Sequence, residues 1–138
     1  MTATSQTTGR LLKRAQYRNH RAADRALAEI GTTLVQWDAL RAIDEAPGAS
    51  AHALALATFQ SDQSFGTLAA RLIAQGLVER SPGRGRRVEH RLTDAGRRML
   101  AAGQAVTAEV MARSFADLSA AEIETLHGLL ERVGEAPE

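Results

Sequence analysis

The chain has 138 residues, a length that suits a single domain, and 44% of them are hydrophobic. It contains no cysteine, which excludes a disulfide framework, a thiolate nucleophile and a cysteine redox switch within this chain. The net charge of +1 conceals an uneven distribution, typical of a protein that turns one surface towards a polyanion: six Lys and Arg against one acid in residues 10–25, eight Arg against three acids in residues 71–98, and two Arg against seven acids in residues 99–138.

Both ends of the chain are polar. We predict a disordered arm over residues 1–9 and a short tail over residues 135–138. No apolar run approaches the roughly 20 residues of a membrane span, and the N-terminus lacks the apolar core of a signal peptide. These features predict a cytoplasmic protein without a membrane partner.

Two amphipathic helices are predicted in the first third of the chain. The first runs over about residues 10–29 and ends at Gly31, because its apolar residues recur at helical spacing. The second covers about residues 33–45 and is stopped by the Pro and Gly at positions 47–48.

The middle of the chain has the order of a helix-turn-helix followed by a basic hairpin. Ser50 is a suitable N-cap for a short helix over residues 51–58. After a tight turn, Ser61 or Asp62 caps a fourth helix that runs to about residue 75. A strand, a Gly-rich turn and a returning strand with alternating apolar residues then predict a hairpin, whose wing covers residues 81–91.

Two further helices complete the chain. Thr93 caps a long helix over residues 94–115, and a capping box from Ser119 to Glu122 opens the last one. The apolar stripes of these outer helices exceed what one small domain obviously buries, so we predict a homodimer. The fold class is mainly α. The expected organisation is one winged helix-turn-helix domain over residues 10–134, with dimerisation helices over 10–31 and 94–134 and a DNA-binding core over 33–93.

The fourth helix and the wing carry the residues that suit DNA. Gln63 can pair with adenine through two hydrogen bonds, and Thr67 can contact a base edge or a thymine methyl. Ser61, Ser64 and Arg71 lie at the end or flanks of the helix and fit phosphate contacts better. The wing arginines, which suit a narrow and electronegative minor groove, are Arg84, Arg86 and Arg87. A two-fold dimer then predicts binding of double-stranded DNA at a pseudo-palindromic operator.

Two residues of the fourth helix are unexpected there. Gly66 lies in the helix interior, where glycine costs about 1 kcal/mol relative to alanine. Either a close approach to DNA or tight packing beneath the hairpin explains it. Asp62 is unfavourable beside a phosphate, and its simpler role is to complement the dipole at the helix start.

The residue patterns of an enzyme are missing. The histidines have neither HExxH nor paired spacing, and no P-loop or dinucleotide fingerprint occurs. We predict structural roles for His90, on the buried face of the returning strand, and for His127, in the last helix. We therefore expect no catalysis, no cofactor and no metal ion.

Two segments carry a family resemblance: Gly-Leu-Val-Glu-Arg at residues 76–80 and Leu-Thr-x-x-Gly at residues 92–96. With the basic wing between them, they resemble the MarR family of bacterial transcriptional regulators, and the resemblance extends over about residues 10–134. It implies a two-fold dimer formed by the first, fifth and sixth helices, a fourth helix in the major groove and a wing Arg in the minor groove. In many members a small phenolic or anionic ligand fills a crevice between the dimerisation and DNA-binding parts and releases the DNA.

The chain departs from the family pattern in two places. The family's wing carries Asp-x-Arg; here Arg86 matches the Arg, but Arg84 occupies the Asp position. Either the tip is looser, or Glu89 or the DNA positions Arg86. The fourth helix has Gly66 and Thr67 where many members have Thr-Arg, so the operator sequence is not predicted.

The resemblance also suggests where an effector binds. Candidate residues of the crevice, with cationic groups that favour an anion, are Tyr17, His20, Trp37 and Arg41; the alternative for Trp37 is a plain core residue. The leading hypothesis is a homodimeric, sequence-specific repressor that an aromatic or anionic ligand releases from its operator. The alternatives are a helical protein-interaction module whose basic faces bind acidic partners, and a ligand sensor with only non-specific DNA affinity.

Overall fold

The computed structural model describes residues 2–83, 85 and 88–137. Over these residues the chain forms six helices and one antiparallel two-stranded sheet, which confirms a mainly α fold with a small hairpin. The elements are α1 (Ser5–Ala28), α2 (Leu34–Glu45), α3 (Ala51–Ala57), α4 (Asp62–Ala74), β1 (Val78–Pro82), β2 (Val88–Leu92), α5 (Asp94–Ser114) and α6 (Ala120–Gly134).

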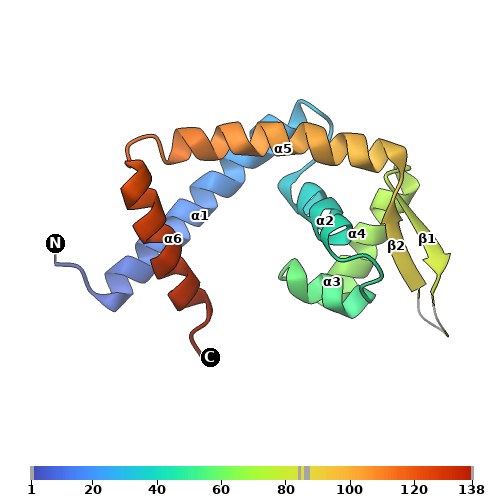
Figure 1. Cartoon of the computed structure of the whole chain (residues 1–138), viewed down its shortest axis with the longest axis horizontal. Helices are drawn as coiled ribbons and strands as arrows, with labels where there is room; N and C mark the ends of the chain where they lie inside the picture. Colours follow the sequence, from blue (N-terminus) through green and yellow to red (C-terminus); the bar gives the residue numbers. More distant parts are fainter. Residues whose placement is uncertain (1, 84, 86–87, 138) are drawn as a thin grey trace.

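The long helix α5 connects two parts of the molecule (Figure 1). Helices α2, α3 and α4 and the hairpin gather at its N-terminal end, while α6 follows its C-terminal end. Helix α1 packs against α5 and also contacts α2. The helix-turn-helix and the hairpin therefore form one unit, and α6 lies apart from it.

The start of α1 differs from the sequence-based prediction. The helix begins at Ser5 rather than near Arg10, so the disordered arm expected over residues 1–9 is wrong for residues 5–9. The cause is a capping box made by two threonines: the Thr4 hydroxyl accepts from the Thr7 amide at 3.1 Å, and the Thr7 hydroxyl accepts from the Thr4 amide at 2.8 Å. These bonds satisfy amide groups that a helix start otherwise leaves without a partner.

The other helix starts follow the predicted capping chemistry. Ser50, Thr93 and Ser119 are N-caps as predicted, and Ser61, not Asp62, caps α4. In each case the side-chain oxygen accepts a hydrogen bond from the amide three residues later. This bond fixes the point at which the chain turns into the helix.

The main core lies where α2, α3, α4, the hairpin and the start of α5 meet. Phe65 and Leu72 of α4 are completely or almost completely buried there. A second cluster joins α1, α2 and α5 around Trp37, whose side chain is 7% exposed. The Trp37 indole donates to the Leu100 carbonyl at 3.0 Å, and a side chain on Gly103 would collide with its ring. Trp37 is therefore a core residue.

The two family-specific segments meet at the junction of the hairpin and α5. The Thr93 amide donates to the Leu77 carbonyl at 3.0 Å, and the Thr93 hydroxyl donates to the Gly76 carbonyl at 2.6 Å. The same hydroxyl accepts from the Gly96 amide at 3.0 Å. A Cβ on Gly96 would collide with the Leu77 carbonyl. These contacts fix the start of α5 against the start of the hairpin, and thereby the direction in which the hairpin leaves the domain.

Candidate nucleic-acid interface

Helix α4 has a buried apolar face and an exposed polar face. Phe65, Ala69 and Leu72 point into the main core. The five helix residues predicted to meet DNA are all exposed: Ser61, Gln63, Ser64, Thr67 and Arg71. The core thus holds the helix rigidly while its polar face stays accessible.

The hydrogen bonds of this face determine what each side chain can offer to DNA. The Ser61 hydroxyl accepts from the Ser64 amide at 3.1 Å and donates to the Ser64 hydroxyl at 3.0 Å, so the Ser64 proton remains available for a phosphate. The Thr67 hydroxyl donates to the Gln63 carbonyl at 3.1 Å, which leaves its methyl group and a lone pair. The side chains of Gln63 and Arg71 have no hydrogen-bond or ion-pair partner among the described residues.

Gly66 lies in the middle of this polar face. Among the described residues, a Cβ on Gly66 would meet no atom of another element within 4 Å. Tight packing beneath the hairpin, one of the two explanations of this glycine, is therefore wrong. The other explanation, a close approach of the α4 backbone to DNA, stays a prediction.

The hairpin forms the base of the wing. Its strands pair in antiparallel register, with Arg80 opposite His90 and Ser81 opposite Glu89. The Glu89 side chain lies over Gly83, where a Cβ would come within 2.8 Å of it, and also lies 3.7 Å from the Arg91 guanidinium. The predicted wing contacts Arg84, Arg86 and Arg87 fall outside the described residues, so a role for Glu89 in positioning Arg86 stays a prediction.

His90 connects the hairpin to α4, as its predicted structural role requires. The side chain is 7% exposed, and its ring meets the Phe65 ring edge to face, with the centroids 6.2 Å apart. Burial lowers the pKa of His90, and the nearby Arg80 lowers it further. His90 is therefore held in its neutral form, although Nδ1 has no hydrogen-bond partner among the described atoms.

One contact within the helix-turn-helix could not be predicted from the sequence. His52 Nδ1 of α3 lies 2.8 Å from Asp62 Oδ1 of α4, and both side chains are exposed. The two residues are ten positions apart, a separation that follows from the turn and not from a helical repeat. Asp62 is thus more than a helix-start residue, because it also joins the two helices.

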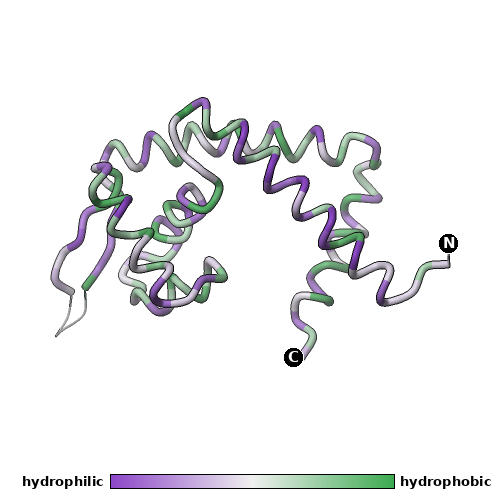
Figure 2. Tube along the Cα trace, turned by 180° about the vertical axis from the view of Figure 1, so that it is seen from behind, coloured by the Kyte–Doolittle hydropathy of each residue, from purple (hydrophilic) through white to green (hydrophobic). Residues whose placement is uncertain are grey.

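The N-terminal basic block is separate from the wing. It lies on α1, which is hydrophilic over most of its length (Figure 2), and the N-terminal half of α1 and the hairpin are at opposite ends of the molecule (Figure 1). Arg18 and Arg25 line a groove of about 830 Å³ between α1 and α5, together with Arg113, Glu29 and Asp117. Over the described residues, the two basic blocks therefore do not form one continuous surface.

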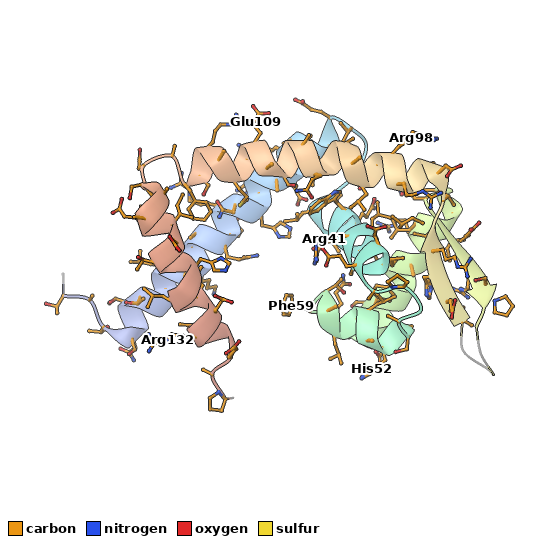
Figure 3. The ribbon with its side chains drawn as sticks, in the orientation of Figure 1. Arg41, His52, Phe59, Arg98, Glu109 and Arg132 are labelled. Atoms are coloured by element: carbon orange, nitrogen blue, oxygen red, sulfur yellow. The ribbon has the colours of Figure 1, made fainter. Side chains whose placement is uncertain are left out.

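The four effector candidates do not share one of the grooves found in the structure. Tyr17 lines a groove along α1 that includes none of the other three. His20 pairs with Asp24 at 3.3 Å. Arg41 projects from α2 on the side away from the hairpin (Figure 3), and its guanidinium pairs with carboxylates at 2.8 Å and 2.7 Å, those of Asp38 and Glu45. Trp37, as described, belongs to the core.

Neither a metal-binding cluster nor a membrane-spanning helix occurs among the described residues. No group of three or more His, Asp or Glu side chains gathers there where it could hold a metal ion. No helix in the described ranges combines the length and the apolar composition needed to cross a membrane.

A helix-turn-helix whose second helix exposes a polar face, followed by an antiparallel hairpin fixed to its core, defines a winged helix-turn-helix protein. Comparison with protein families matches residues 30–87 to the MarR family. A Pseudomonas aeruginosa protein, described as a probable transcriptional regulator, is 33% identical over 91% of this chain and 95% of its own, with a TM-score of 0.81. The chain belongs to the MarR family of DNA-binding transcriptional regulators.

Other solved structures support this assignment. A MarR family protein of Mycobacterium tuberculosis in complex with DNA is 28% identical over 97% of this chain and 100% of its own, with a TM-score of 0.78. The structure of a Mycobacterium tuberculosis MarR family protein with p-aminosalicylic acid is 29% identical over 92% of this chain and 98% of its own, with a TM-score of 0.77. Among curated protein sequences, none matches the chain significantly.

Proposed function

We propose that the protein is a homodimeric repressor that binds a pseudo-palindromic operator through α4 and the wing and leaves it when a small aromatic or anionic ligand binds. The observation that carries the proposal is the exposed face of α4, whose Gln63 and Arg71 side chains have no hydrogen-bond or ion-pair partner among the described residues. A core that holds a helix and leaves such a face open is suited to base and phosphate contacts.

The outer helices support the homodimer. None of the residues of α6 is buried, although the helix carries a stripe of large apolar side chains. Their exposed fractions are 39% for Ile123, 48% for Leu129, 39% for Leu130 and 60% for Val133. A second copy that covers this stripe would bury apolar surface that the single chain leaves in water.

The mode of DNA binding can be tested with a wing variant. Arg86→Ala removes one guanidinium from each protomer. If that group contacts a phosphate, the slope of log affinity against log salt should become shallower by about one unit for each protomer bound. Fluorescence anisotropy with a labelled duplex at several salt concentrations measures this slope. Arg132→Ala, on α6, is the matched control and should leave it unchanged. An unaltered affinity and slope in Arg86→Ala would contradict the wing assignment.

The ligand part of the proposal rests on Arg41 and on the relative that binds p-aminosalicylic acid. Because Asp38 and Glu45 already neutralise Arg41, an anionic ligand has to compete with two carboxylates, and we expect weak binding. A thermal-shift screen of aromatic acids tests the proposal, since a ligand of the folded state raises the melting temperature. Acids that neither raise it nor release DNA would contradict this part alone.

A further inference from the structure

An exposed ion pair bridges the two helices of the helix-turn-helix. His52 is the second residue of α3 and Asp62 the first residue of α4, and His52 Nδ1 lies 2.8 Å from Asp62 Oδ1. The side chains are 67% and 70% exposed, so the core does not require either of them. Figure 3 shows His52 projecting from α3 on the side away from α5, the side towards which the hairpin also extends. The pair therefore lies beside the polar face of α4.

The hydrogen bond to Asp62 determines which ring nitrogen of His52 can donate to another group. An ionised carboxylate only accepts hydrogen bonds, so His52 Nδ1 has to carry a proton to bond Asp62. In a neutral imidazole the other nitrogen, Nε2, is then an acceptor. Phosphate oxygens are acceptors as well. The neutral pair can therefore offer no hydrogen bond to a DNA backbone, whereas the doubly protonated ring can donate from both nitrogens.

Protonation of His52 also changes the net charge of the pair in favour of DNA binding. With a neutral imidazole the pair carries the full negative charge of Asp62, which opposes the approach of a phosphate to the start of α4. With an imidazolium the pair is neutral overall and turns an N–H group outwards. Uptake of one proton thus replaces a repulsive group by a hydrogen-bond donor.

Other charged groups on the elements packed against α3 are engaged elsewhere or lie apart from His52. On α2, Arg41 is paired with Asp38 and Glu45, and on β2, Glu89 lies beside Arg91. Within the described chain, Asp62 is the charged side chain at ion-pair distance from His52. The remaining charged or titratable residues of α2, α4 and β2 are Asp44, Arg71 and the buried His90.

We infer that His52 contacts the DNA backbone: in its protonated form it neutralises Asp62 and donates from Nε2 to a backbone phosphate, so that each protomer takes up one proton when it binds DNA. This inference rests on the proposed DNA-binding function. Because a phosphate contact carries no sequence information, random and selected duplexes should show the same pH dependence.

The expected effect follows from the linkage between proton uptake and affinity. Uptake of one proton raises affinity by at most about tenfold for each unit by which the pH falls. Because each protomer takes up one proton on binding, we expect the wild type to bind DNA several-fold more tightly at pH 6 than at pH 8. The salt slope should also be steeper at pH 6, by about one unit per protomer.

The test is fluorescence anisotropy of the full chain with a random and a selected duplex, at constant ionic strength, from pH 8 to pH 6. His52→Gln keeps a hydrogen-bond donor but cannot take up a proton, so its affinity should stay within about twofold over this range. His127→Gln is the matched control, because it removes another exposed histidine paired with an acid, Glu131 at 3.4 Å, on α6. It should keep the pH dependence of the wild type. Asp62→Asn should bind more tightly than the wild type at pH 8.

The outcomes separate this inference from the proposed function. A wild type that binds both duplexes equally at every pH overturns the proposed sequence-specific function, and a wild type that binds neither duplex overturns this inference as well. DNA binding without pH dependence, or pH dependence that persists in His52→Gln, overturns this inference alone. Nitrogen NMR of the imidazole ring provides a second measurement: at pH 7.5 the addition of duplex should protonate His52 Nε2, and an unchanged signal would contradict the phosphate contact.

Discussion

Replacing Gly66 with alanine separates the stability of α4 from its contact with DNA. Gly66 is exposed in the helix, and a Cβ there would meet no other element in the described part of the chain. Alanine should therefore remove the cost of a helical glycine, about 1 kcal/mol, without a steric penalty. For 138 residues the entropy of unfolding is about 0.29 kcal/mol/K, so the melting temperature should rise by about 3–4 °C.

The DNA affinity of Gly66→Ala should change in the opposite direction. If the α4 backbone approaches the DNA at this residue, the added methyl group occupies the space of a close contact. Forcing an extra methyl group into a packed contact costs about 1–3 kcal/mol. Since about 1.4 kcal/mol is a factor of ten in Kd, the variant should bind the operator about five- to 140-fold more weakly.

Thermal unfolding and fluorescence anisotropy on the same sample give both quantities. Gly9→Ala is the matched control, because Gly9 is also exposed in a helix, with no other element near its Cβ position, and lies on α1, far from the hairpin. Gly9→Ala should also raise the melting temperature, but by less than Gly66→Ala, because Gly9 lies near the end of its helix. It should bind DNA like the wild type. A stabilised Gly66→Ala with unchanged affinity would refute the proposed backbone approach, and a destabilised one would refute the open space around Gly66.

Three further predictions concern the wing, the dimer and the junction of the hairpin with α5. Burial and Arg80 lower the pKa of His90 in the folded protein, whereas a histidine in the unfolded chain titrates near 6.5. Because the unfolded state takes up the proton first, the free energy of unfolding should fall as the pH drops from 7 to 5.5. Urea unfolding should show a smaller fall in His90→Leu. Leu129→Lys should convert the dimer into a monomer in sedimentation experiments, while Leu56→Lys, which replaces another exposed leucine, should leave it a dimer. Gly96→Ala should lower the free energy of unfolding by about 1–3 kcal/mol or more, measured by urea unfolding, because its Cβ would collide with the Leu77 carbonyl.

The order of the elements and most of their ends could be predicted because local chemistry sets them. Ser50, Thr93 and Ser119 are short hydroxyl side chains in front of apolar periodic segments, and each one caps the helix that follows. The start of α1 could not be read in the same way. Its capping box uses Thr7 in place of the usual Glu or Gln, and the surrounding residues are polar, so the segment had the composition of a disordered arm.

The part of the site that lies on a single helix could be predicted from the sequence. The exposed face of α4 follows from helical periodicity, which also explains the burial of Phe65. Contacts between elements could not be predicted, because they depend on how the chain turns in space. The pair of His52 with Asp62 arises from the angle between α3 and α4, and the open surroundings of Gly66 depend on where the hairpin lies.

Selection of binding sequences from a pool of random duplexes tests the central claim most directly. A two-fold dimer that reads DNA through α4 should enrich a pseudo-palindrome whose half-sites have centres about 10–10.5 base pairs apart. Gln63→Ala should relax the preference at two positions related by the two-fold axis, because a bidentate base contact is lost from each half-site. A pool without an enriched motif, or a single motif without two-fold symmetry, would contradict the account.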